Sequence, residues 1–256
     1  MFRNCRTGYA DWQKFRPYRY AHRGLHDIAA GIPENTMPAF RRAAEMGFGV
    51  ELDVHLTTDG RLVVIHDSNL KRLCGVDRKA NELSSGEYQN LGILGTEHHA
   101  PMLEDVLPLF EGKAPLIVEI KVDGGNAPAV TEAACKLLDR YHVTYCMESF
   151  HPQAVAWLRK HRPDVVRGQL SCNYAKEKSV SLHPLLRKPM AGLYSNLLTR
   201  PDFIAYKFAD RDHPAVRLCI KKYGAQEVNW TITSQKDLET AEKDGAIVIF
   251  EGFLPE

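Results

Sequence analysis

The sequence has no long apolar run and no excess of charge of either sign. No window approaches the run of about 20 apolar residues that a membrane-spanning helix needs, so stable membrane insertion is not expected. Residues 1–20 mix polar and aromatic side chains and lack the apolar core of a secretory signal. The formal net charge is +1, which gives no broad field for attracting nucleic acid. These absences predict a cytoplasmic protein that binds no nucleic acid and holds any anionic substrate through a local cluster of cations.

Cysteine pairs and internal repeats are also missing. The six cysteines are scattered, with no CxxC pair and no adjacent histidine at metal-binding spacing. In a chain of 256 residues this pattern favours reduced thiols over a disulfide framework. The 44% hydrophobic and 25% charged residues are typical of a globular protein with a substantial core. The sequence has no repeat of fixed period, so a solenoid is not expected.

Short apolar segments alternate with amphipathic ones along most of the chain. Such alternation predicts a parallel sheet with intervening helices, and eight core strands suit a closed (β/α)₈ TIM barrel. We expect one domain over residues 1–256, with a small insertion at about 68–100 after the second strand. Helices are predicted after Pro33, where Asn35 or Thr36 can cap, and at 101–110, 128–141, 152–162, 213–223 and 235–243. The predicted strands are 19–21, 49–54, 116–120, 144–149, 165–170, 201–206, 227–232 and 246–250.

Ionisable residues stand at the ends of several predicted strands. Glu51, Asp53 and His55 share one face of the second strand, because side chains alternate between faces, while apolar residues occupy the other face. Catalytic groups of TIM barrels lie where the strands end and the next loops begin. The residues predicted to meet there are His22, Arg23, Glu51, Asp53, His66, Glu119 and Lys121, with Glu148 and Trp230 at later strand ends.

This set of residue types favours the chemistry of a phosphodiesterase. Three carboxylates suit a hard divalent cation, Mg²⁺ or Ca²⁺. An arginine and a lysine beside that cation suit a phosphate, and two histidines can act as general base and general acid.

The ordered motifs resemble those of the glycerophosphodiester phosphodiesterase family. The resemblance runs from residue 19 to about residue 248, and the ordered set is more specific than any one motif. The motifs are His22-Arg23-Gly24, Pro33-Glu34-Asn35-Thr36, Glu51-Leu52-Asp53-Val54, Thr58-Asp59-Gly60, Val64-Ile65-His66-Asp67, Pro101-Met102-Leu103-Glu104, Val118-Glu119-Ile120-Lys121, Ser149-Phe150 and Asn229-Trp230-Thr231.

The resemblance implies a TIM barrel and metal-dependent hydrolysis of a small glycerophosphodiester to glycerol 3-phosphate and an alcohol. It assigns the two histidines to acid–base catalysis through a cyclic phosphate. Which histidine is the acid and which the base stays open, and we favour His66 as base and His22 as acid. The implied metal ligands are Glu51, Asp53 and Glu119, and the implied substrate contacts are Arg23, Lys121 and Trp230. The last strand departs from the family pattern at Ile249 to Glu251, which leaves the alcohol preference open. The roles of Glu148 and the oligomeric state are open as well.

Several other interpretations remain at this point. A phospholipase D- or C-like phosphodiesterase or lyase acting on lysophospholipid or phospholipid needs an exposed apolar rim near the insertion, whose sequence is polar. A structural ring of ion pairs could join Glu51 and Asp53 to Arg23 and Lys121. Trp230 could belong to the core, and Glu34 and Asn35 could serve structure alone. A barrel that only binds phosphate esters should lack a histidine or a ligand, and an amidohydrolase should carry an H-x-H pair after its first strand. Neither is the case here.

Overall fold

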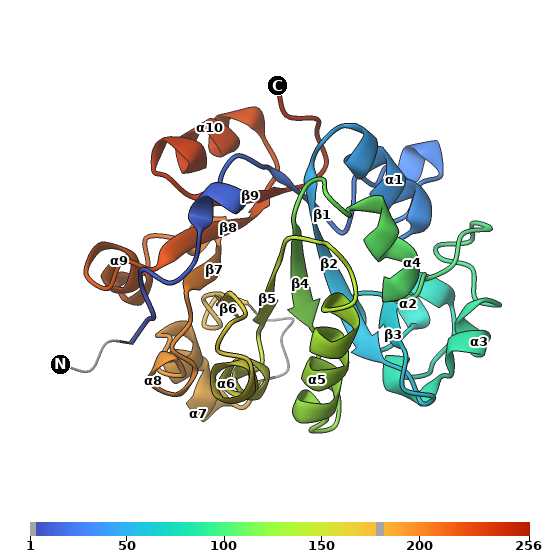
Figure 1. Ribbon diagram of the computed structural model, residues 1–256, viewed down its shortest axis with the longest axis horizontal. Coiled ribbons are helices and arrows are strands. Elements are labelled where there is room, and N and C mark those ends of the chain that lie inside the picture. The colour runs from blue at the N-terminus through green and yellow to red at the C-terminus, as the bar shows by residue number, and fades with distance from the viewer. Residues whose placement is uncertain (1–3, 178–181) are drawn as a thin grey trace. The chain divides into compact units, whose positions relative to one another are not determined.

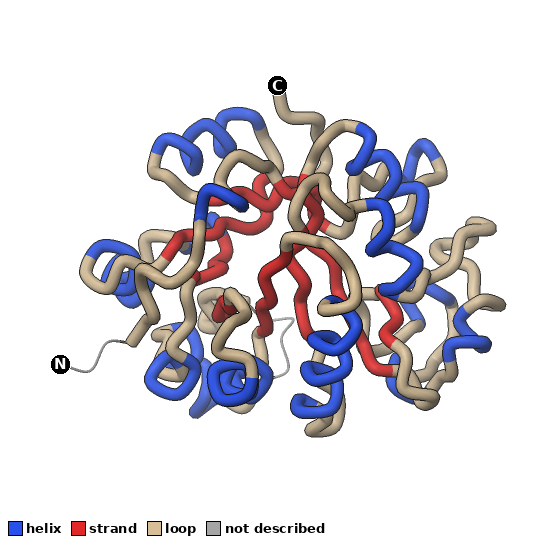
Figure 2. The backbone as a smooth tube through the Cα atoms, viewed as in Figure 1, coloured by secondary structure: helices blue, strands red, loops and turns tan. Residues whose placement is uncertain are grey.

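The computed structural model describes residues 4–177 and 182–256 and divides the chain into two compact units (Figure 1). The N-terminal unit is Tyr18–Tyr145. The C-terminal unit combines the leader up to Pro17 with Cys146–Glu256. Strands and helices alternate along the chain in both units (Figure 2). No helix within the described ranges is both long and apolar enough to cross a lipid bilayer.

Three parallel strands form the centre of the N-terminal unit. β2 (Gly49–Leu56) pairs with β1 (Tyr20–His22) on one side and with β4 (Leu116–Ile120) on the other. β3 (Leu62–Val64) returns antiparallel along the end of β2 after a tight turn. Residues 62–64 therefore extend the sheet beside the end of β2.

Helices of this unit pack against its strands. They are α1 (Met37–Glu45), α4 (Leu103–Val106) and α5 (Ala127–Leu138), with 3₁₀ turns at Ile28–Ala30 and Leu107–Leu109. Gly47, with φ of 75°, follows the end of α1, as the sequence predicts. Thr36 occupies the N-cap position of α1, as predicted, but its side chain makes no capping hydrogen bond because it donates to the carbonyl of Pro33. Asn35 donates to Asp53 instead.

The insertion after β3 has its own small apolar cluster. It contains α2 (Lys71–Cys74), a 3₁₀ turn at Ala80–Glu82 and α3 (Ser85–Tyr88). Its apolar side chains pack together and against residues of β3 and the segment before α4. The insertion therefore has a buried apolar cluster although its sequence is mostly polar. The buried members are Val63, Ile65, Leu70, Leu73, Ala80, Leu83, Tyr88, Ile93, Ala100 and Met102.

Five parallel strands form the sheet of the C-terminal unit. They are β5 (Tyr145–Ser149), β6 (Arg167–Ser171), β7 (Phe203–Lys207), β8 (Gln226–Ile232) and β9 (Ile247–Phe250), paired in that order. Gly168 and Phe203 show how tightly β6 and β7 pack. A Cβ on Gly168 would lie 2.1 Å from the Phe203 ring, so only glycine fits there without movement.

The helices between these strands match the predicted ones closely, with one addition. α6 (Pro152–His161), α9 (Pro214–Lys221) and α10 (Gln235–Lys243) were expected within about two residues. The irregular stretch 176–196 contains α7 (Pro184–Ala191), and its residues 178–181 lie outside the described residues. α8 (Asn196–Thr199) was not predicted. Further 3₁₀ turns lie at Trp12–Lys14 and Phe208–Asp210.

Candidate active site

Three buried carboxylates meet in the N-terminal unit. Glu51 and Asp53 share one face of β2, and the pairing register sets Asp53 opposite Glu119 on β4. The three residues are 3%, 1% and 5% exposed, and one ligand atom from each lies within 4.8 Å of the others. Three buried acids so close together are costly unless cations neutralise them. Oxygen ligands of this kind fit a hard divalent cation, so the donor set agrees with the predicted metal site.

Lys121 and Arg23 face this acidic cluster. Lys121 Nζ lies 2.8 Å from Asp53 Oδ1 and 2.8 Å from Glu119 Oε1. Arg23 Nε lies 3.5 Å from the other Asp53 oxygen, Oδ2, which also accepts a 2.8 Å hydrogen bond from Asn35 Nδ2. The structure therefore brings the predicted metal ligands and the predicted phosphate-contacting cations into one site.

The pKa values of Asp53 and Glu119 are shifted in opposite directions. Burial acts to raise the pKa of Asp53, but Lys121, His66 and Arg23 outweigh it and hold that pKa well below its usual value. Burial also raises the pKa of Glu119, and here Lys121 and His66 only partly oppose the rise. Asp53 therefore stays ionised to lower pH than a free aspartate, whereas Glu119 retains its proton to higher pH than a free glutamate.

The loop after β1 holds Arg23 and Asn35 in strained backbone conformations. Arg23 has φ of 57° and Asn35 has φ of 53°, both in the left-handed region. Hydrogen bonds stabilise this loop: Arg23 N donates to the Glu51 carbonyl at 2.8 Å, and Asn35 N donates to the Arg23 carbonyl at 2.9 Å. At Gly24, with φ of 81°, a Cβ would meet Ala39 at 2.9 Å. Backbone strain of this kind concentrates at functional sites, which agrees with the predicted role of His22-Arg23-Gly24.

Both predicted acid–base histidines border the acidic cluster. His22, the last residue of β1, has its Nε2 3.8 Å from Glu51 Oε2. His66 follows β3 and is close enough to lower the pKa of both Asp53 and Glu119. The side chains of His22 and His66 are 14% and 33% exposed, so both are partly accessible. Both histidines are therefore placed where a bound ligand of the acidic cluster could meet them.

A network that the sequence did not predict connects His66 with Arg23. His66 Nδ1 lies 2.7 Å from Asp67 Oδ1, and Asp67 accepts two hydrogen bonds from Arg72 of α2, at 2.7 and 2.8 Å. Arg72 also donates to both oxygens of Glu34, at 2.9 and 3.1 Å, and Glu34 accepts from Arg23 Nη1 at 2.7 Å. Arg72 of the insertion thus bridges Asp67, the partner of His66, and Glu34, the partner of Arg23.

The hydrogen bonds of this network shift its acids toward the charged form. Partial burial acts to raise the pKa of Asp67, but hydrogen bonds from His66 and Arg72 outweigh it and lower that pKa. Burial likewise acts to raise the pKa of Glu34, and Arg72 and Arg23 together lower it. An ionised carboxylate on Nδ1 fixes the orientation of His66, as in other histidine–carboxylate pairs.

A second buried pair supports the backbone of His66. His55 is 0% exposed, and its Nδ1 lies 2.6 Å from Asp123 Oδ2. Its other ring nitrogen, Nε2, lies 3.3 Å from the backbone oxygen of His66. His55, which the sequence left unassigned, thus contacts the segment that carries His66. The side-chain alternation places His55 on the face of Asp53, but no sequence signal identifies Asp123 as its partner.

Trp230 and Glu148 lie in the C-terminal unit. Trp230 of β8 is half-buried, and its ring meets Phe150 edge-on at a centroid distance of 5.6 Å. Both rings pack beside a small cluster that includes Tyr174 and Met190. Glu148 is 1% exposed on β5. Ile249 is buried in β9, so the segment that departs from the family pattern begins inside the core.

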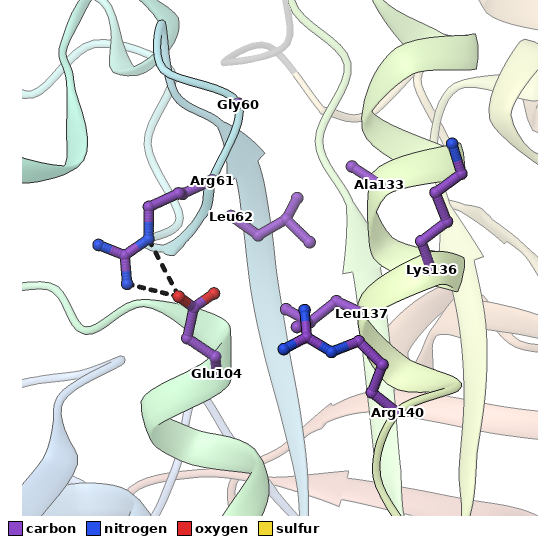
Figure 3. A pocket seen from close by; sticks show the side chains of 8 residues that line it. All are labelled: Gly60, Arg61, Leu62, Glu104, Ala133, Lys136, Leu137 and Arg140. Atoms are coloured by element: carbon purple, nitrogen blue, oxygen red, sulfur yellow. Dashed lines mark hydrogen bonds and ion pairs between the residues drawn. The ribbon is translucent and has the colours of Figure 1, made fainter.

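A pocket elsewhere in the N-terminal unit shares no residue with this site (Figure 3). It has a volume of about 390 Å³ and lies beside α5 and the turn before β3. The ion pair between Arg61 and Glu104 forms one wall. Lys136 of α5 and Arg140, which follows that helix, stand on the opposite side (Figure 3). The pocket is lined by no histidine, and its one acid is already paired with arginine, so it lacks the groups for the predicted metal binding and acid–base catalysis.

Comparisons with known proteins give the family. The family model for the glycerophosphoryl diester phosphodiesterase family matches residues 22–249. A glycerophosphodiester phosphodiesterase of Caldanaerobacter subterraneus is 29% identical over 244 residues, covering 88% of this chain and 89% of that protein. A human lysophospholipase D is 34% identical over 145 residues, covering 52% of this chain and 45% of that protein. This chain belongs to the glycerophosphoryl diester phosphodiesterase family.

Solved structures give the fold. A phosphodiesterase of Oleispira antarctica, determined in complex with its product sn-glycerol 3-phosphate, matches with a TM-score of 0.73 at 20% identity, covering 96% of this chain and 95% of that chain. The predictions of the family, of the (β/α)₈ barrel and of a phosphodiesterase enzyme are confirmed. The organisation of residues 1–256 as a single domain stays a prediction.

Proposed function

We propose that this enzyme hydrolyses small glycerophosphodiesters to glycerol 3-phosphate and an alcohol with the help of one divalent cation, Mg²⁺ or Ca²⁺. The observation that carries the proposal is the cluster of three buried carboxylates with an arginine, a lysine and two histidines near it. Family membership supports the substrate class. The proposed metal ligands are Glu51, Asp53 and Glu119, the proposed acid–base pair is His22 and His66, and the proposed substrate contacts are Arg23, Lys121 and Trp230.

Arg23 and Lys121 bind the negatively charged phosphate of the diester. Arg23 presents a planar guanidinium that matches two phosphate oxygens, and Lys121 adds a point charge. A divalent cation held by the acids would add positive charge where the phosphoryl oxygens gain negative charge. Trp230 supplies an apolar wall for the glycerol or the alcohol.

The two histidines move the protons of the reaction. His66, oriented by Asp67, takes the proton of the neighbouring glycerol hydroxyl as its oxygen attacks phosphorus. The bond from phosphorus to the alcohol oxygen breaks, and His22 protonates that oxygen as it leaves. An internal hydroxyl is already positioned for attack, which removes much of the entropic barrier. The product of this step is a cyclic phosphate, which water opens with the two histidines in reversed roles.

The test is an assay of three soluble glycerophosphodiesters with and without EDTA. Glycerophosphocholine, glycerophosphoethanolamine and glycerophosphoglycerol should release glycerol 3-phosphate only when a divalent cation is present. His22→Ala and His66→Ala should abolish release, whereas the control variant His99→Ala, at an exposed histidine of the insertion, should not. Phosphorus NMR should detect the cyclic phosphate during turnover. Release that persists after chelation and metal-free dialysis would overturn the proposal.

A second candidate is hydrolysis of lysophospholipids. Such an enzyme needs an exposed apolar rim near the insertion, and the insertion buries most of its apolar residues instead. An exposed apolar surface is nevertheless present at α7 and α8 of the C-terminal unit. The similarity to a human lysophospholipase D over 145 residues also favours this candidate. Release of choline from lysophosphatidylcholine, measured beside glycerophosphocholine, distinguishes the two substrates.

A further inference from the structure

Exposed apolar side chains concentrate on two neighbouring helices of the C-terminal unit. Among the described residues, eleven large apolar side chains are exposed, and five of them lie between residues 185 and 198. Single exposed leucines are ordinary, but so many exposed apolar residues within one short segment indicate a surface that contacts something apolar. The group, called here the leucine surface, consists of Leu185 (80% exposed), Leu186 (50%), Tyr194 (67%), Leu197 (56%) and Leu198 (68%).

The helices cannot rotate to bury these side chains, because their other faces are already packed. Ala191, at the end of α7, is buried in a cluster with Cys172 and Tyr174. On α8, Asn196 and Thr199 are 0% exposed, and Arg159 of α6 donates to the carbonyl of Leu198. Figure 1 shows α6, α7 and α8 together at one side of the C-terminal unit. The leucine surface is therefore a fixed outward face.

The charged residues within the segment that carries the leucine surface are all cations. Residues 182–200 contain Arg187, Lys188 and Arg200 and no aspartate or glutamate, although the whole chain has a net charge of only +1. Lys188 is exposed, and neither it nor Arg200 forms a salt bridge within the described residues. An apolar surface bordered by cations complements an anionic lipid surface, whose head groups attract lysine and arginine and whose acyl chains accept leucine.

We propose that the leucine surface docks this protein on the surface of an anionic lipid bilayer. The helices α7 and α8 are too short to cross the membrane and would lie in its interface. A symmetric dimer through the same surface would set its cations against themselves, which is unfavourable. The inference goes beyond the proposed hydrolysis and holds whichever alcohol is released.

Vesicle flotation tests the proposal with the full chain. We expect binding to vesicles of phosphatidylcholine with about one-third phosphatidylglycerol, much weaker binding to phosphatidylcholine alone, and loss of binding as salt is raised. The double variant Leu185→Ser with Leu198→Ser should lower the partition coefficient on the order of 100-fold. Lys188→Ala should lower it about fivefold.

Matched controls separate docking from general effects. Leu218→Ser removes a 42% exposed leucine of α9, and Lys136→Ala removes an exposed lysine of α5; both should bind as the wild type does. The leucine substitutions remove exposed groups, so thermal unfolding midpoints should stay unchanged. As an independent measurement, Tyr194→Trp should add fluorescence that brominated phospholipid quenches.

Three results would overturn the proposal. The first is failure of the wild-type protein to float with anionic vesicles. The second is equal binding by the wild type and the double leucine variant. The third is a dimer in analytical ultracentrifugation that the double leucine variant dissociates, because the surface would then belong to a second copy of the chain.

Discussion

Replacing Lys121 by methionine should destabilise the protein when no divalent cation is bound. Lys121 Nζ contacts Asp53 and Glu119 at 2.8 Å each, and these three side chains are only 12%, 1% and 7% exposed. Exposed ion pairs contribute about 0–1 kcal/mol, but removing one partner of a buried pair costs about 3–5 kcal/mol, because the other charge is left buried alone. We therefore expect a loss of about 3–5 kcal/mol, or about 6–20 °C in the unfolding midpoint.

Adding Mg²⁺ or Ca²⁺ should reverse much of this loss. A cation that binds the folded site alone, at about 100 times its dissociation constant, adds about 2.7 kcal/mol of stability. Urea unfolding of the wild type and of Lys121→Met, each with EDTA and with the cation, measures both effects. Lys136→Met is the matched control: its partner is Glu132, both side chains are at least half-exposed, and the change should stay below about 1 kcal/mol.

The outcome separates a metal site from a structural ring of ion pairs. If the three acids only pair with Arg23 and Lys121, the cation should leave the stability of the lysine variant unchanged. Equal stability of Lys121→Met and the wild type in EDTA would refute the reasoning altogether, since it would mean that no uncompensated charge remains buried at the site.

Three further predictions concern other parts of the molecule. Arg72→Ala should lower kcat by about 10- to 100-fold and raise KM, because it removes the four hydrogen bonds that hold Asp67 and Glu34, the partners of His66 and Arg23. Arg78→Ala, at an ion-paired arginine of the same insertion, is the control. Equal kinetics of Arg72→Ala and the wild type would contradict the prediction. Because burial raises the pKa of Glu119, the affinity for a divalent cation should rise with pH until the Glu119 carboxyl is ionised. Titration calorimetry in two buffers of different ionisation enthalpy should detect the proton released on cation binding. An affinity that does not change with pH would contradict this prediction. Gly168→Ala should cost about 1–3 kcal/mol in urea unfolding, because its Cβ would meet the Phe203 ring at 2.1 Å, and an unchanged midpoint would show that the ring can move freely.

Much of the fold could be predicted from local sequence pattern. β4 (Leu116–Ile120) and α10 (Gln235–Lys243) have the predicted bounds, because each is a clear apolar or amphipathic segment between turn residues. The alternation of side chains along β2 also predicts that Glu51 and Asp53 share one face. The ends of parallel strands meet at one edge, so residues distant in sequence could be assigned to one site.

The partners of those residues were decided only by the tertiary structure. Sequence pattern indicates that Asn35 caps a helix, since capping is a local interaction, whereas the fold brings it to Asp53. Arg72 shows the same limit: an arginine in a polar insertion is usually solvated, and only the packing of that insertion brings it to Glu34 and Asp67.

The outward face of α7 and α8 is a further example. Periodicity shows that a helix has an apolar side, but it does not show whether a neighbouring element covers that side. Leu185 and Leu198 are of a residue type that is usually buried. They are exposed because the opposite faces of their helices are already packed. Sequence determines which groups are available and their local spacing, whereas contacts between distant segments depend on how the whole chain packs.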